Sequence, residues 1–153
     1  MRLPALALAT LLALPFAASA ANAAAAEPAY DADLAKSLGA DERGMRPYVL
    51  VILKTGPNKM PAGEARTKMF EGHFANMGKL AGEKKLVVAG PLDGKEGRRG
   101  IFVFNTPDID AAKAWVATDP VIINGEMVAE YHKFYGSAAL MMVNEVHGMI
   151  EKK

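Results

Sequence analysis

His73 is the residue of this 153-residue chain whose type best suits acid–base chemistry. An imidazole titrates at about pH 6.5, so it can accept a proton and return it under neutral conditions. The spacing of apolar residues puts His73 on the buried side of a predicted helix, where water is scarce. The alternative is a core histidine satisfied by one hydrogen bond, and the residues alone leave both interpretations open.

Asp119 also has two interpretations. Because Pro120 follows it, Asp119 is a ready N-cap for a helical turn over residues 121–124, with the proline at the first helical position. The alternative is a carboxylate that orients His73 or takes a proton from the substrate. Trp115 lies one helical turn earlier and could floor an apolar pocket beside the acid, or simply fill the core. One aspartate can cap a turn and face a pocket at once, so the interpretations are compatible.

The other two histidines raise the question of a metal site, which their surroundings do not favour. The spacing of Glu145 and His147 matches no strong ligand motif, and His132 lies in a different predicted element. Met141 and Met142 are spaced for packing, since methionine fills irregular gaps between apolar side chains. We therefore predict no metal ion, and the proposed proton chemistry requires no cofactor.

Three glycines at a spacing of three, Gly94, Gly97 and Gly100, do not form a phosphate-binding loop. They lie between two predicted strands, whereas a phosphate loop joins a strand to a helix. The pattern predicts a flexible hairpin loop instead. Arg98 and Arg99 could still meet an anionic ligand at the mouth of this loop.

A regular alternation of strands and helices positions these candidates. Continuous apolar runs rich in β-branched and aromatic residues predict buried strands, and a 3.6-residue apolar period predicts helices. Thr106 should begin the helix after the third strand, Gly90 should end the second strand, and Gly148 should interrupt the last helix. The expected strands are 48–53, 86–89, 101–104 and 128–135, and the expected helices are 30–38, 64–83, 106–119, 121–124 and 137–150.

The β-α-β-β-α-β order, with an N-terminal extension and a C-terminal helix, predicts an α+β fold of the ferredoxin-like type. The first and third strands are central in that fold, and these are the two strands without a polar face. Helices are expected to cover one side of the sheet. The apolar residues on the other side must therefore be buried in another way. Packing on the same face of a second subunit would give a homodimer with a cavity between its sheets.

The first 20 residues have the three parts of a secretory signal. Arg2 supplies a positive start, residues 3–16 are apolar, and residues 18–20 form a small-residue cleavage site. We expect cleavage after Ala20, with Ala26 as a second candidate, and a periplasmic or secreted product. The chain is thus divided into a signal peptide (1–20), an Ala-rich extension (21–45), a folded domain (46–140) and a helical tail (141–153).

Composition argues against several classes of protein. The chain has 18 Lys and Arg against 17 Asp and Glu, so it lacks the clustered basic excess of a nucleic-acid-binding protein. A hydrophobic content of 51% argues against disorder. The absence of cysteine removes disulfides and thiol nucleophiles. No stretch after the leader is long and apolar enough to predict a membrane span.

Several short motifs, in this order and spacing, resemble the YCII-related family of small dimeric α/β-barrel proteins. The resemblance covers roughly residues 47–140. It rests on His73, Leu80, the Leu86-Val87-Val88-Ala89-Gly90-Pro91-Leu92 run, Ala114-Trp115, Asp119-Pro120, Gly125 and the His132-Lys133-Phe134-Tyr135-Gly136 run. The leader and the Ala-rich extension depart from the typical cytoplasmic member.

The resemblance implies a ferredoxin-like dimer related in fold to muconolactone isomerase. Family members carry a suspected catalytic His and Asp, which fall on His73 and Asp119 here, and one member is a dehydrochlorinase of chlorinated hydroquinone degradation. We expect Pro91 and Trp115 to contact the ligand. The expected chemistry is isomerisation or elimination on a small cyclic or carbonyl compound.

Two other functions fit the same sequence. The dimer cavity could bind an apolar or aromatic small molecule without turning it over. Alternatively, the N-terminal extension and the Met-rich tail could dock a protein partner. Loss of activity in His73→Gln with the fold retained would indicate an enzyme, whereas a binding module should keep most of its affinity in that variant.

Overall fold

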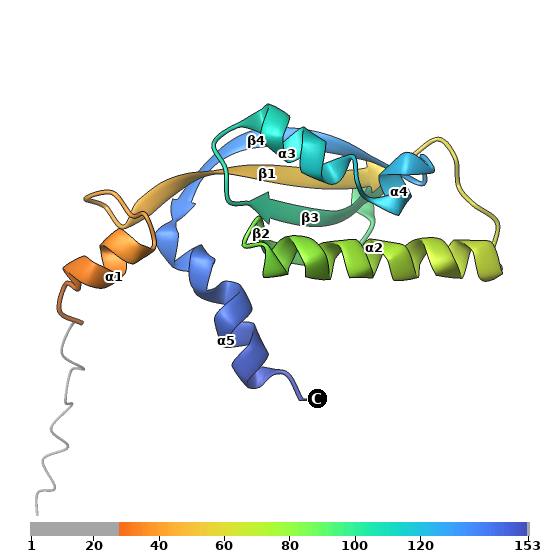
Figure 1. The fold of residues 1–153 in the computed structure, drawn as a ribbon. Helices are drawn as coiled ribbons and strands as arrows, with labels where there is room; N and C mark the ends of the chain where they lie inside the picture. The colour runs from red at the N-terminus through yellow and green to blue at the C-terminus, as the bar shows by residue number, and fades with distance from the viewer. Residues whose placement is uncertain (1–27, 153) are drawn as a thin grey trace, which may run out of the picture. The chain divides into compact units, whose positions relative to one another are not determined.

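Four antiparallel strands form one sheet in the order β2-β3-β1-β4 (Figure 1). This is the predicted ferredoxin-like arrangement, with the first and third strands in the centre. The strands are β1 (Met45–Thr55), β2 (Leu86–Pro91), β3 (Arg98–Phe104) and β4 (Met127–Ser137). The structure is a computed structural model that describes residues 28–152. The predicted signal peptide and both candidate cleavage sites lie outside the described residues.

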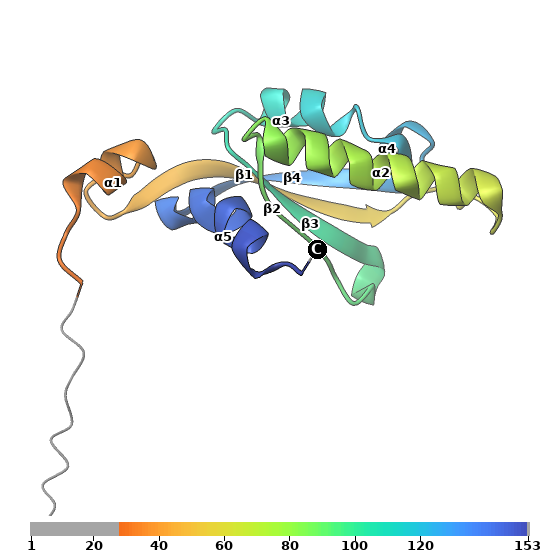
Figure 2. The ribbon, with the colours of Figure 1, turned by 60° about the horizontal axis from the view of Figure 1, so that its bottom comes forward.

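Helices α2 (Glu64–Gly82), α3 (Ile109–Val116) and α4 (Pro120–Ile123) lie on one face of the sheet (Figure 2). Alternate residues of β1 point into this layer, as expected for a strand whose side chains have a period of two. The main core between the sheet and these helices consists of Val49, Val51, Leu53, Met69, Leu80, Leu86, Phe102, Phe104, Ala112, Val116, Val121 and Met127.

The opposite face of the sheet is covered in part by the C-terminal segment. A 3₁₀ helix, η2 (Ala138–Met142), leads into α5 (Val143–Ile150), which lies on the other side of the sheet from α2 (Figure 2). Leu140 and Met141 pack against a small second core of Tyr48, Val87 and Val103. The expectation that helices cover one face alone therefore needs correction, because this segment covers part of the second face.

Several predicted element boundaries were wrong. Strands β1 and β3 both begin three residues earlier than expected, at Met45 and Arg98. Strand β2 continues through Gly90 to Pro91, because an outer strand of a sheet tolerates proline on its unpaired edge. Helix α3 begins after Asp108 rather than at Thr106, because Asp108 accepts the N–H of Asp110 at 2.8 Å as the cap. Helix α5 runs through Gly148 without interruption, in open space where no neighbour constrains the backbone.

The described part of the extension folds back onto the domain. Helix α1 (Ala32–Ser37) begins at Asp31, whose side chain accepts the N–H of Leu34 at 2.9 Å. The Arg46 guanidinium donates to Leu38 O at 2.6 Å and to Asn105 Oδ1 at 2.6 Å, so it joins the end of this segment to the loop after β3. The predicted domain limits at residues 46 and 140 stay predictions. None of the helices in residues 28–152 is long and apolar enough to cross a membrane.

Candidate active site

The structure brings His73 and Asp119 into direct contact. His73 comes from the middle of α2, and Asp119 is the N-cap residue of α4. Their Nδ1 and Oδ2 atoms are 2.7 Å apart, and the two side chains are 9% and 1% exposed. The second oxygen, Oδ1, accepts the N–H of Val121 at 3.1 Å. Asp119 therefore caps its helix and contacts the histidine at the same time.

A close approach of α2 to α4 makes this contact possible. A Cβ atom added at Gly72 would lie 3.0 Å from Cγ of Pro120, which is tighter than ordinary packing. The glycine thus lets the two helices meet next to the pair, where a larger residue would push α4 away. In the sequence Gly72 reads as a helix-weakening residue, and its packing role could not be seen without the partner helix.

Aromatic rings surround the His73 imidazole. The ring centroids of Phe70, Phe74 and Phe102 lie 6.1, 5.3 and 6.1 Å from it. Nδ1 of the ring is hydrogen-bonded to Asp119, whereas Nε2 has no hydrogen-bond partner within residues 28–152. In that range the fully buried side-chain nitrogens without a partner are the Nε atoms of Arg46 and Arg66, so Nε2 is not sealed off. The second ring nitrogen is therefore available to a ligand.

His73 lines a pocket of about 330 Å³ between α2 and the sheet. Helix α2 provides a stripe at positions 70, 73, 74 and 77, which share one side of a helix. Pro91, the other residue expected to contact the ligand, lies in the wall. The full lining is Leu53, Phe70, His73, Phe74, Met77, Ala89, Gly90, Pro91, Arg99, Gly100, Phe102 and Met127.

Trp115 does not line this pocket. Its ring packs against Phe104 at 5.6 Å between centroids, and the Lys85 ammonium lies 5.5 Å from its centroid. This placement agrees with the alternative of core packing and not with the expectation that Trp115 floors the pocket and contacts the ligand. By contrast, Phe74 is 63% exposed although the helical pattern puts it on the buried face, because that part of the face meets the pocket and not the core.

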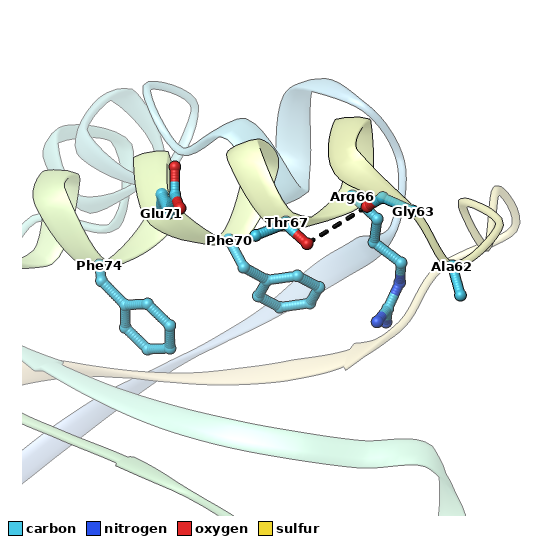
Figure 3. A pocket seen from close by; sticks show the side chains of 7 residues that line it. All are labelled: Ala62, Gly63, Arg66, Thr67, Phe70, Glu71 and Phe74. Carbon is cyan, nitrogen blue, oxygen red and sulfur yellow. Dashed lines mark hydrogen bonds between the residues drawn. The ribbon is translucent and has the colours of Figure 1, made fainter.

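A second hollow of about 360 Å³ follows the first half of α2 and shares two of its walls with the His73 pocket. Figure 3 shows Phe70 and Phe74 pointing to the same side of the helix as Arg66, while Glu71 points the other way. The Arg66 guanidinium lies 4.8 Å from the Phe70 ring centroid. Phe70 thus contacts both the Arg66 cation and the His73 ring.

Arg66 also forms an ion pair with a buried carboxylate that the sequence reasoning missed. Its Nη2 donates to Oε1 of Glu126 at 2.6 Å, and the backbone N–H of Met60 donates to Oε2 at 2.7 Å. The hydrogen bond from Arg66 lowers the pKa of Glu126 most, the N–H of Met60 adds to this, and burial opposes both. The residues are 60 positions apart, so no local spacing could have indicated the pair.

The remaining candidates lie elsewhere. His132 Nε2 is 3.0 Å from Glu130 on β4, and His147 Nε2 is 4.0 Å from Glu151 on α5. No group of three or more His, Asp or Glu side chains suited to a metal ion occurs within the described part of the chain. Arg98 pairs with Glu96 at 2.8 Å, outside the pocket, whereas Arg99 lines it.

The fold and the paired His and Asp define an α+β ferredoxin-like domain with a histidine-lined pocket. A sequence model of the YCII-related domain matches residues 47–134, which is more than half of the chain. The chain therefore belongs to the YCII-related family.

Among solved structures, the chain is similar to 5-chloro-2-hydroxyhydroquinone dehydrochlorinase (TftG) from Burkholderia phenoliruptrix AC1100, in complex with 2,5-dihydroxybenzoquinone. The two are 19% identical, with a TM-score of 0.43 over 57% of this chain and 92% of the other. A comparison with curated proteins found no match.

Proposed function

We propose that this protein is a cofactor-free acid–base enzyme of the isomerase or lyase type, acting on a small cyclic or carbonyl compound. One observation carries the proposal: the 2.7 Å contact between His73 Nδ1 and Asp119 Oδ2, beside a pocket that the same histidine lines. A histidine that serves only the core needs no carboxylate partner and no access to a ligand. Here it has both.

The carboxylate fixes which nitrogen of His73 carries the proton. Asp119 is an acceptor when ionised, so Nδ1 donates to it and the lone pair stays on Nε2. Nε2 is then the base. When it takes a proton and the ring becomes charged, the carboxylate 2.7 Å away stabilises the imidazolium.

The proposed reaction begins at a C–H bond next to a carbonyl group. Nε2 takes the proton, and the C–H electron pair moves toward the carbonyl oxygen to form an enolate. In an isomerisation the imidazolium returns the proton to another carbon of the same molecule. In an elimination the enolate electrons expel a leaving group from the neighbouring carbon, and the proton passes to water or to that group.

A homodimer and a secreted location belong to the same proposal. Ile52 and Ile101 pair across β1 and β3 on the face opposite α2, beyond the part covered by η2, and both are half-buried. A second sheet packed on this face would remove them from water. The apolar leader at residues 1–20 supports export to the periplasm or the medium.

A proton-exchange assay tests the catalytic proposal before the natural substrate is known. Cyclohexanone in D₂O would be incubated with wild type and with His73→Gln, and loss of the α-proton signals followed by NMR. We expect exchange to be about 100-fold slower in the variant, since a positioned base contributes at least that much. Equal exchange by two folded proteins would contradict catalysis, and a ligand retained by His73→Gln would indicate a binding module.

A further inference from the structure

We infer that Arg99 binds an anionic oxygen group of the substrate, and that the substrate is therefore a small planar organic anion. The inference rests on the proposed function, because it concerns the same pocket. It specifies that the ligand is negatively charged and names the residue that binds this charge. The supporting observations are the position of Arg99, the state of its neighbours and the character of the remaining walls.

Arg99 differs from the other arginines near the site in having no acceptor. Arg66 directs its guanidinium group to Glu126, and Arg98 directs its guanidinium group to Glu96. Within residues 28–152, the Arg99 guanidinium forms no ion pair and no hydrogen bond, although its residue is half-buried in the pocket wall. A guanidinium offers five N–H donors and cannot give up its charge, so a half-buried one without an acceptor is suited to receive one from a ligand.

Glu126 does not offer Arg99 a free oxygen. Glu126 is close enough for the charge of Arg99 to contribute to the lowering of its pKa. However, its Oε1 is bonded to Arg66 and its Oε2 to the N–H of Met60. Both oxygens of Glu126 are therefore occupied by other donors, and within residues 28–152 Arg99 is left without a bonded carboxylate. An anionic group of the ligand would supply the acceptor that Arg99 lacks.

The other walls indicate what the anion is attached to. Three phenylalanines, Met77 and Met127 line the same space, and Gly100 leaves room over the sheet because it has no side chain. A planar apolar body can stack on such walls, and an arginine matches a carboxylate or an ionised ring oxygen in the same plane. A bare inorganic anion would pair with Arg99 but would make no contact with the aromatic walls.

The test compares benzoate with benzamide, which has nearly the same shape and no charge. Binding would be measured by calorimetry, and its position by the methyl NMR signals of Met77 and Met127, both in the pocket. We expect benzoate to bind at least about 10-fold more tightly than benzamide, because hydrogen bonds to charged groups are the stronger ones. Acetate, which has the charge but no ring, should bind more weakly than benzoate.

Three variants assign the effect to one residue. Arg99→Met should weaken benzoate binding about 10- to 100-fold and leave benzamide unchanged. Arg98→Met is the matched control, since it removes the same charge one residue away but outside the pocket, and it should leave both ligands unchanged. Arg99→Lys retains the charge without the planar fork and should fall between wild type and Arg99→Met.

The inference is overturned if benzoate does not bind at millimolar concentration, if benzamide binds as well, or if Arg98→Met has the same effect as Arg99→Met. If acetate binds as tightly as benzoate, the inference that the ligand has a planar body is contradicted. If Arg99→Met does not fold, the wild-type comparison and Arg99→Lys decide. The two proposals can fail separately: a wild type that binds benzoate through Arg99 but exchanges no protons contradicts the catalytic proposal alone.

Discussion

Asp119 uses its two oxygens for two different tasks, and the two can be separated by substitution. Oδ1 accepts the N–H of Val121 as a helix cap, and Oδ2 contacts Nδ1 of His73. Asparagine is also a good cap, so Asp119→Asn should preserve the start of α4 while removing the negative charge. Alanine removes both contacts and should cost about 1 kcal/mol more for the lost cap alone.

We expect Asp119→Asn to reverse the proton position on His73. The amide NH₂ donates where the carboxylate accepted, so Nδ1 becomes the acceptor and the proton moves to Nε2. Nitrogen-15 NMR of the histidine rings distinguishes the two tautomers directly. Proton exchange should fall in the same variant although the fold is retained. Unchanged ring-nitrogen shifts would contradict the orienting role of Asp119.

A second prediction at this scale concerns acid stability. Hydrogen bonds from Arg66 and from the N–H of Met60 hold the pKa of Glu126 below its ordinary value of 4.5. The unfolded chain therefore takes up a proton first as the pH falls, so the stabilisation is complete above about pH 4.5 and is lost below it. At neutral pH wild type should be more stable than Glu126→Gln by about 2 kcal/mol, and this difference should shrink toward about pH 3.

Urea unfolding of both proteins across this pH range measures the effect. Glu64→Gln serves as the control, because it removes the same charge from an exposed pair with Lys68. A Glu64→Gln protein should show the wild-type pH dependence. A Glu126→Gln protein with that same dependence would show that the buried carboxylate does not govern acid stability.

Some residues of the candidate site could be predicted from the sequence, and others could not. His73 and Asp119 could be singled out because their types suggest chemistry, and Pro91 because of a family motif. Arg66 and Glu126 could not, because an ion pair between a helix and the start of a strand 60 residues away leaves no local pattern. Trp115 was assigned to the ligand on its size and position, yet the sequence does not specify which side of α3 meets the pocket.

At the scale of elements, the contact of α2 with α4 decides whether the pair can form. We expect Gly72→Ala to weaken the His73–Asp119 contact, because its Cβ would press on Pro120 at 3.0 Å and displace α4. Gly78→Ala is the matched control in the same helix, where nothing lies within 4 Å of the added atom. It should stabilise the protein by about 0.5–1 kcal/mol and leave proton exchange unchanged. Equal exchange rates in the two variants would contradict this role of Gly72.

The element order and the central strands followed from the sequence because burial on both faces leaves a continuous apolar run. The predicted 48–53 and 101–104 strands are the inner β1 and β3. The ends of the elements could not be predicted as well, because they depend on partners. Strand β2 extends to Pro91 because Gly100 of β3 pairs with it there. The second-face packing of η2 was missed because an amphipathic tail does not specify which surface it meets.

At the scale of the whole molecule, the sheet face around Ile52 and Ile101, which we call the uncovered face, leads us to expect a dimer. We expect Ile52→Lys to weaken the proposed dimer roughly 100-fold or more, because a partner sheet would bury an uncompensated charge. In a monomer the new ammonium could pair with Glu130, which lies opposite Ile52 on β4, so the fold should survive. Sedimentation velocity and circular dichroism measure the two effects.

Ile123→Lys is the matched control, since Ile123 is exposed on α4 in the helical layer and away from the uncovered face. It should leave the sedimentation coefficient unchanged. A wild type that sediments as a monomer at micromolar concentration, or a dimer unaffected by Ile52→Lys, would contradict association through this face.

The stripe of α2 at positions 70, 74 and 77 has a consequence for how such a domain diversifies. These three side chains form much of the ligand-facing wall, yet each lies within one turn of His73 and none bonds to Asp119. Changes confined to one short coding segment can therefore alter the size and shape of the cavity while the proton-handling pair is retained. A small combinatorial library at Phe70, Phe74 and Met77 would sample new ligand preferences, much as drift within a lineage would.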